Sequence, residues 1–189
     1  MSLIPKYIEF TKRWEGGLSR DPNDTASKFP CPTPFNGKSG WHTNVGITYT
    51  VWRKMFGANN DHRFYAMNAD DWWNVFKTLY WNGVRGDEFK SQNVAIFVTG
   101  MAWGSGKKQA TKSLQKCIKQ LGKDIDQDGI LGNQTIRLAN ECDPRELFDA
   151  LTTERERFFR AIAPAGSKNA KFLKGWLNRL EDYKRTFRP

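Results

Sequence analysis

Residue types that commonly build metal sites and disulfide frameworks are scarce in this sequence. Its 189 residues include only three cysteines, Cys31, Cys117 and Cys142, and only two histidines, His42 and His62. The cysteines are scattered and none belongs to a CxxC pair, so the sequence indicates neither a disulfide framework nor a zinc site. We therefore expect reduced, partly buried thiols, no metal site and no cofactor.

Long hydrophobic runs are also missing. No segment approaches the roughly 20 apolar residues that a bilayer-spanning helix needs. The first residues, MSLIPKYIEF, have neither the charged start nor the apolar core and cleavage site of a secretory signal peptide. We expect a protein without a transmembrane segment, made in the cytoplasm, whose export would depend on another component.

Positive charge is abundant. The formal net charge is +10, which favours a polyanionic partner such as nucleic acid, an anionic cell wall or an outer-membrane surface. Eight tryptophans could serve a core, stack on sugars or stack on bases. No nucleic-acid recognition motif accompanies the charge, so we expect no nucleic-acid partner.

Apolar residues recur at helical spacing along most of the chain, and no convincing strand or internal repeat is visible. This pattern predicts an all-α fold, interrupted by a long irregular region over residues 16–47. A loop of that length in a compact domain is usually functional. A shift to lysine-rich sequence suggests a soft boundary between residues 1–104 and 105–189. Expected helices cover about residues 5–15, 48–57, 68–83, 91–106, 107–122, 143–163 and 167–187.

The stretch RWEGG places a carboxylate at a predicted helix end. Gly16 and Gly17 would end the first helix, which leaves Glu15 in its last turn on the face that carries Ile8 and Thr11. The negative end of a helix and apolar neighbours both disfavour an ionised carboxylate, as a general acid requires. By position alone, a solvent-facing glutamate at a frayed helix end is the commoner case.

The loop after this helix adds further polar groups. Asp21 and Asp24 follow Glu15 by six and nine residues, and Thr43 and Thr48 lie farther along in HTNVGIT. Each can be explained as an ordinary loop or turn residue. Together they supply an acid, a second carboxylate and hydroxyl groups, the combination that glycoside hydrolysis uses.

Three segments in order, EGG, DPND and TNVGIT, resemble the signature of glycoside hydrolase family 108. These are lysozyme-like N-acetylmuramidases found in phages and bacteria. Family-like features continue with YWNG at 80–83, MAWGSG at 101–106 and GWLNRL at 175–180, so the similarity spans nearly the whole chain. The resemblance implies a lysozyme-like fold with its catalytic part in residues 1–104.

The resemblance also implies site residues. The catalytic glutamate of the family corresponds to Glu15, and the spacing of phage-type lysozymes gives Asp24 the second role, with Thr43 nearby. Asp21 and Thr48 would contact substrate. This chain departs from the family by inserting TASKFPCPTPFNGKS after Asp24, and Trp41 and His42 at the end of the insertion could add contacts to sugar.

A second motif lies in residues 113–138. The stretch DIDQDG resembles the start of a calcium-binding EF-hand loop, but a threonine occupies the twelfth position, where a bidentate glutamate is needed. The alternative pattern, Leu-Gln followed by Asp-Gly-x-x-Gly-x-x-Thr, resembles the predicted peptidoglycan-binding segment of family 108 proteins. Turn chemistry explains each of its residues, so we favour a structural turn over a ligand site.

Taken together, these features predict a peptidoglycan hydrolase that cleaves the β-1,4 bond between N-acetylmuramic acid and N-acetylglucosamine. Peptidoglycan glycan strands would be its partner, bound also by residues 105–189. A phage or prophage endolysin fits the resemblance, with a separate holin-like or export partner. Two alternatives stay open: a lytic transglycosylase on the same substrate, and a non-catalytic cell-wall-binding or secretion-accessory protein.

Overall fold

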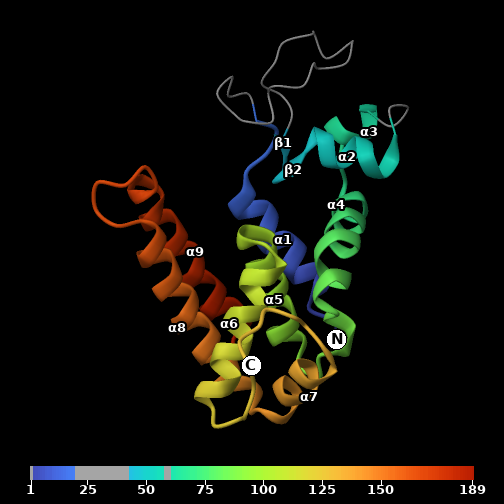
Figure 1. Ribbon diagram of the computed structural model, residues 1–189. Coiled ribbons are helices and arrows are strands. Elements are labelled where there is room, and N and C mark those ends of the chain that lie inside the picture. Colours follow the sequence, from blue (N-terminus) through green and yellow to red (C-terminus); the bar gives the residue numbers. More distant parts are fainter. Residues whose placement is uncertain (1, 20–42, 58–60) are drawn as a thin grey trace. The chain divides into compact units, whose positions relative to one another are not determined.

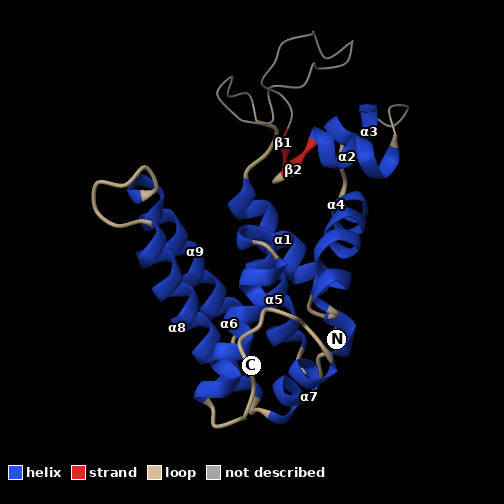
Figure 2. Cartoon of the chain, viewed as in Figure 1, coloured by secondary structure: helices blue, strands red, loops and turns tan. Residues whose placement is uncertain are grey.

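The computed structural model describes residues 2–19, 43–57 and 61–189. The chain divides into two compact units, Met1–Thr78 and Leu79–Pro189, and each is described by itself. Helices dominate both, as Figures 1 and 2 show, which confirms the predicted all-α, lysozyme-like class. In the described part of the chain, no helix is both long enough and apolar enough to cross a membrane.

The first unit combines short helices with one small hairpin. Its elements are α1 (Ile4–Glu15), β1 (Thr43–Asn44), β2 (Ile47–Thr48), α2 (Tyr49–Phe56), α3 (Asp61–Tyr65) and α4 (Ala69–Phe76). Local signals fix the helix ends. The side chain of Thr48 accepts a hydrogen bond from the backbone N–H of Val51 at the start of α2, and Asn68 accepts one from Asp71 at the start of α4.

Aromatic side chains make up the core of the first unit. Tyr7 of α1 packs on Phe76 of α4, with ring centroids 5.3 Å apart, and Phe76 stacks on Trp72 at 4.8 Å. Trp52 of α2 packs on Phe64 of α3 at 5.9 Å. All five side chains are almost fully buried. Their burial therefore holds α1 against α4 and α2 against α3.

The second unit is larger and more regular. The π-helical turn η3 (Lys77–Trp81) crosses the boundary between the two units. After it come the short 3₁₀ helices η4 (Asn82–Val84) and η5 (Gly86–Glu88), followed by α5 (Gln92–Ser105), α6 (Lys107–Gln120), α7 (Asn133–Glu141), α8 (Pro144–Ile162) and α9 (Ala170–Phe187).

Helix α5 is the centre of the second unit. It is apolar on all sides, with an almost continuous buried run over residues 94–102, and it contacts both α6 and α8. Phe97 packs against Phe148 of α8 and Tyr183 of α9, with centroids 5.3 and 5.0 Å apart. Helix α8 begins as its sequence predicts, because Asp143 accepts hydrogen bonds from the backbone N–H groups of Arg145 and Glu146.

Two expectations about local structure were wrong. The helix expected over residues 68–83 is α-helical only to Phe76 and continues as the π turn η3 and the 3₁₀ turn η4. The region 16–47, expected to lack strands, contains β1 and contributes to a hairpin with β2. Strands of two residues are too short to produce an alternating pattern, so periodicity could not reveal them.

Candidate active site

Glu15 is the last residue of α1, as the sequence predicts. Gly16 follows it with a φ of 69°, a conformation that favours glycine and that turns the chain away from the helix axis. The Glu15 side chain is half-buried, whereas Ile8 and Thr11 on the same face are buried. The carboxyl thus lies at the negative end of α1, at the edge of the first unit's core.

The chain beyond Glu15 pairs with the hairpin. An isolated antiparallel bridge joins Leu18 to Asn44. The backbone N–H of Ser19 donates to the Thr43 carbonyl at 2.7 Å, and that of Val45 donates to the Gly17 carbonyl at 3.4 Å. The structure therefore brings Thr43, far from Glu15 in sequence, to the segment that directly follows the carboxylate.

The hairpin has one buried face and one more open face. Thr43 lies opposite Thr48, and Asn44 lies opposite Ile47. Asn44 and Ile47 are buried, while both threonines are half-buried. Because side chains alternate across a strand, Thr43 and Thr48 share the open face. The Thr48 hydroxyl accepts the N-cap hydrogen bond of α2, so its own hydrogen can be donated elsewhere.

The turn of the hairpin is strained, and distant residues hold it in place. Val45 and Gly46 have φ values of 47° and 75°, the conformation of a type I′ turn. A β-branched residue rarely adopts positive φ. The Val45 carbonyl accepts a hydrogen bond from Trp72 Nε1 at 3.0 Å, and the buried Asn44 amide donates to the Phe64 carbonyl at 2.7 Å.

These supporting residues were missed by the sequence analysis. The glycine of TNVGIT was a usable turn signal, but valine at the preceding position argues against a type I′ turn. Nothing in the sequence pairs Trp72 with Val45 or Asn44 with Phe64, because the partners are 27 and 20 residues apart. Only the packing of α3 and α4 against the hairpin creates these contacts.

Thr11 is a further feature of this helix face. Its side chain is 1% exposed, and its hydroxyl has no hydrogen-bond partner among the residues that the structure describes. A buried hydroxyl without a partner costs free energy. Thr11 precedes Glu15 by one helical turn, so this cost lies directly beside the candidate acid.

Four predicted site residues cannot be placed. Asp21, Asp24, Trp41 and His42 lie outside the described residues. The proposed partner carboxylate and the added sugar contacts therefore stay predictions. Of the predicted site, the structure brings the segment after Glu15 together with Thr43 and, across the hairpin, Thr48.

The motif of residues 113–138 forms a turn built around one glutamine. The buried Gln115 side chain donates to Asp128 Oδ1 at 2.7 Å and to the Ile130 carbonyl at 3.1 Å, and it accepts from the backbone N–H of Gly129 at 2.9 Å. The Ile130 N–H also donates to Asp128, which lowers the pKa of that carboxyl. These bonds support the turn interpretation. Among the described residues, no three His, Cys, Asp or Glu side chains are grouped to hold a metal ion.

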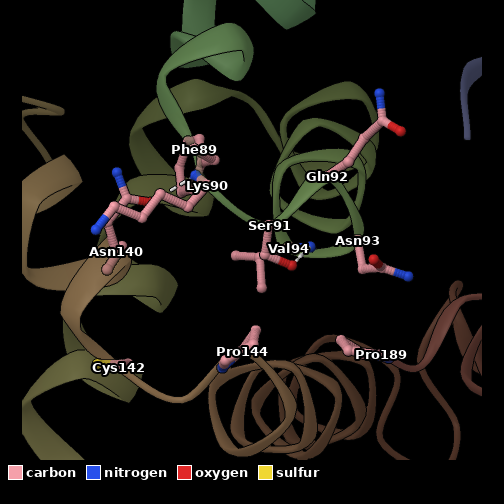
Figure 3. Close-up of a pocket in the computed structure, with 11 residues that line it drawn as sticks. Phe89, Lys90, Ser91, Gln92, Asn93, Val94, Asn140, Cys142, Pro144 and Pro189 are labelled. Carbon is pink, nitrogen blue, oxygen red and sulfur yellow. Dashed lines mark hydrogen bonds between the residues drawn. The ribbon is translucent and has the colours of Figure 1, made fainter. Parts of the chain in front are cut away.

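The second unit contains a cavity of about 460 Å³ between the start of α5 and the start of α8 (Figure 3). Its polar side chains already serve the fold. Asn140 accepts from the backbone N–H of Lys90 at 2.8 Å, Asn93 donates to the Phe187 carbonyl at 2.7 Å, and Ser91 caps α5 through the Val94 N–H. The cavity wall therefore offers few uncommitted polar side chains.

The sequence matches two known families in succession. Residues 8–106 match the family described as Glycosyl hydrolase 108, and residues 109–181 match the Predicted Peptidoglycan domain. No curated protein matches the chain. The fold is similar to a solved structure described as "Structure of Brucella abortus SagA", with 23% sequence identity and a TM-score of 0.68. That similarity covers 97% of this chain and 92% of the other.

Proposed function

Because the chain belongs to the glycosyl hydrolase 108 family and is a peptidoglycan hydrolase, we propose that it is an N-acetylmuramidase with Glu15 as its general acid. The bond cleaved would be the β-1,4 linkage between N-acetylmuramic acid and N-acetylglucosamine. The observation that carries the proposal is the position of Glu15, at the end of α1 and beside the segment that pairs with the Thr43–Thr48 hairpin.

The chemistry needs a protonated carboxyl at the scissile bond. Glu15 would donate its proton to the glycosidic oxygen as the bond to the leaving sugar breaks. The Glu15 side chain is half-buried and belongs to the last residue of α1, next to the segment that pairs with the hairpin. No atom of the described residues lies within 4 Å of where a Cβ on Gly16 or Gly17 would stand, which favours the approach of a sugar ring to the carboxyl.

A second group must stabilise the oxocarbenium-like transition state. We assign this role to Asp24, with Asp21 as the alternative, because the resemblance to phage-type lysozymes gives this spacing. Thr43 and Thr48, on the open face of the hairpin, would donate hydrogen bonds to the substrate or orient a water molecule. Trp41 and His42 would contact a neighbouring sugar.

The two family matches suggest a division of labour. We propose that residues 1–104 carry catalysis and that residues 105–189 hold the enzyme on peptidoglycan. A phage or prophage endolysin that reaches the wall through a separate membrane-permeabilising partner fits this proposal. If the enzyme expressed in the bacterial cytoplasm lyses the cells only when the inner membrane is permeabilised, that route is supported. Lysis without permeabilisation would contradict it.

The test is release of reducing ends from purified peptidoglycan. Glu15→Gln keeps the size of the side chain but cannot act as an acid, so we expect a loss of activity of at least about 100-fold. Glu9→Gln, an exposed position on the same helix, is the matched control and should retain activity. Equal activity in wild type and Glu15→Gln would refute the assignment.

Mass spectrometry of the products distinguishes the reaction type. A muramidase releases fragments that end in reducing N-acetylmuramic acid. A lytic transglycosylase would release 1,6-anhydro ends instead, because no water enters the reaction. Binding to peptidoglycan without any cleavage by the wild type would favour a non-catalytic wall-binding protein.

A further inference from the structure

Arg155 on α8 is a buried cation that pairs with no acidic side chain in the described part of the chain. Its side chain is 9% exposed, and its Nη1 donates a hydrogen bond to Ser105 Oγ at 2.7 Å. Within the residues that the structure describes, no carboxylate forms an ion pair with it. A guanidinium has five N–H donors, so a single hydroxyl acceptor satisfies only a small part of this group.

The environment disfavours this charge. Burial, together with the nearby positive charge of Arg179 on α9, lowers the pKa of Arg155 to about 10. The group still carries its charge at neutral pH, so the fold bears the cost of a desolvated cation. Helix α5 ends at Ser105, and its negative end offsets this cost only in part. Among the described residues, no carboxylate pairs with Arg155 to offset this cost.

The guanidinium lies directly below the molecular surface. Gly104 in the last turn of α5 is exposed, and a Cβ atom on it would come within 2.9 Å of Arg155 Nη2. Because Gly104 has no side chain, nothing from this residue covers the nitrogen. Gly104 in the MAWGSG stretch thus leaves this side of the buried cation without a covering side chain of its own.

Aromatic rings surround the same place. The Arg155 guanidinium lies over the rings of Phe158 and Phe159, at 5.2 and 4.3 Å from their centroids. Phe159 stacks on Trp176 of α9 at 5.2 Å, and Trp176 stacks on Phe172, which is 48% exposed. These rings belong to α8 and α9, two contacting helices that run antiparallel in Figure 1. Such a surface fits an anionic ligand that also has apolar or sugar faces.

We propose that Arg155, together with Arg179, binds a carboxylate of peptidoglycan at the end of α5. A guanidinium matches a carboxylate with two parallel hydrogen bonds, and aromatic rings suit the sugar or alanine methyl groups beside it. The inference rests on the proposed function, which makes peptidoglycan the ligand. Two sources offer this chemistry: the lactyl carboxylate of muramic acid and the carboxylates of the stem peptide.

Isothermal titration of the full-length protein with defined fragments tests the proposal. The fragments are the disaccharide N-acetylglucosaminyl-N-acetylmuramic acid with its stem peptide, the same disaccharide without peptide, the free stem peptide, and the stem-peptide disaccharide with its carboxylates amidated. The proposed muramidase does not cleave the bond within this disaccharide. Binding of the free peptide or of the peptide-free disaccharide identifies which carboxylate is bound.

We expect Arg155→Met to weaken binding of the carboxylate-bearing fragment by roughly tenfold or more. Amidation should weaken binding to the wild type by a similar factor and have little further effect on the variant. Arg160→Met, an exposed arginine on the same helix, is the matched control and should bind normally. Unchanged affinity of Arg155→Met, or equal binding of the amidated fragment by the wild type, would overturn the proposal.

Stability gives an independent readout. Without ligand, Arg155→Met should raise the melting temperature, because it replaces a buried unpaired charge with an apolar chain. A lowered melting temperature with unchanged binding would instead make Arg155 a purely structural residue. If Arg155→Met does not fold, Gly104→Ala, which displaces the guanidinium, should reduce binding in its place.

This experiment is separate from the test of Glu15. If Arg155→Met binds as tightly as the wild type while Glu15→Gln loses hydrolysis, only the carboxylate site is refuted. If Glu15→Gln keeps full activity while Arg155→Met loses binding, only the catalytic assignment is refuted.

Discussion

Trp72 Nε1 donates a hydrogen bond to the carbonyl of Val45, a non-glycine residue with a φ of 47°. The indole is fully buried in α4, and the carbonyl belongs to the turn between β1 and β2. This contact fixes the hairpin whose other end pairs with the segment following Glu15. The position of the candidate site therefore depends on contacts with the core of the first unit.

Removing the indole donor should loosen the hairpin. Trp72→Phe keeps an aromatic ring but loses the hydrogen bond and some volume, so we expect the free energy of unfolding to fall by about 2 kcal/mol. Hydrolysis of peptidoglycan should fall as well. Urea unfolding and reducing-end release measure the two effects. Trp73→Phe, half-buried on the same helix, is expected to cost less, and an equal cost would contradict a specific role for Trp72.

Relieving the turn strain should have the opposite effect on stability. Asparagine accepts positive φ far better than valine, so Val45→Asn should raise the free energy of unfolding by about 1 kcal/mol. Thermal unfolding checks this expectation. Ile47→Asn is the contrast: Ile47 is buried in the adjacent strand, so this substitution should destabilise the protein. A loss of stability in Val45→Asn would show that packing of the valine side chain stabilises the protein by more than the strain of its positive φ destabilises it.

Thr11→Val tests the buried hydroxyl one turn before Glu15. Valine has nearly the same shape without the unpartnered oxygen, so stability should rise by about 1 kcal/mol. The control is Thr99→Val, because the buried Thr99 hydroxyl donates to the Ala95 carbonyl at 2.7 Å and its loss should not stabilise the protein. If Thr11→Val gains stability but loses hydrolysis, the hydroxyl serves Glu15. A loss of stability would mean that the hydroxyl has a favourable partner.

Stability should decline in acid, partly through Asp128. Its pKa is lowered from the ordinary value of 3.8, chiefly by the Ile130 N–H and then by Gln115. A folded-state pKa below the unfolded value means that Asp128 stabilises the fold above about pH 3.8 and that this contribution is lost as pH falls through the folded pKa. In the Asp128→Asn variant, the free energy of unfolding should fall less steeply as the pH is lowered from about 7 to about 3, as measured by urea unfolding. Asp126→Asn removes a carboxylate from the same loop and serves as the control. If it reduces the pH dependence of the free energy of unfolding as much as Asp128→Asn does, the assignment to Asp128 is contradicted.

Cys117 should resist alkylation in the folded protein. Burial, with a smaller effect of Glu154, raises the pKa of its thiol to about 12, so almost no reactive thiolate exists near neutral pH. Iodoacetamide labelling followed by peptide mass spectrometry should show modification at Cys117 at least about tenfold slower in the native state than in urea. Similar rates in both states would contradict the buried position.

The sequence predicted much of the fold because helix ends are local. Asp143 and Pro144, Asn68, and Gly16 after Glu15 each stand next to the helix that they begin or end, and the structure places all of these helix ends as expected. The same local logic placed Glu15 in the last turn of α1. Motif order, which is also a property of sequence alone, identified the family.

What the tertiary structure decided depends on residues far apart in the chain. The pairing of Leu18 with Asn44, the hydrogen bond from Trp72 to Val45 and the burial of Arg155 beside Ser105 each join segments separated by 26 or more residues. No periodicity or capping pattern carries such information, since these contacts arise only when separate helices pack. The sequence by itself determined where α1 ends, where α4 and α8 begin, and which residue is the candidate acid. Packing decided what surrounds that acid, and it buried Arg155 with no carboxylate partner among the residues described.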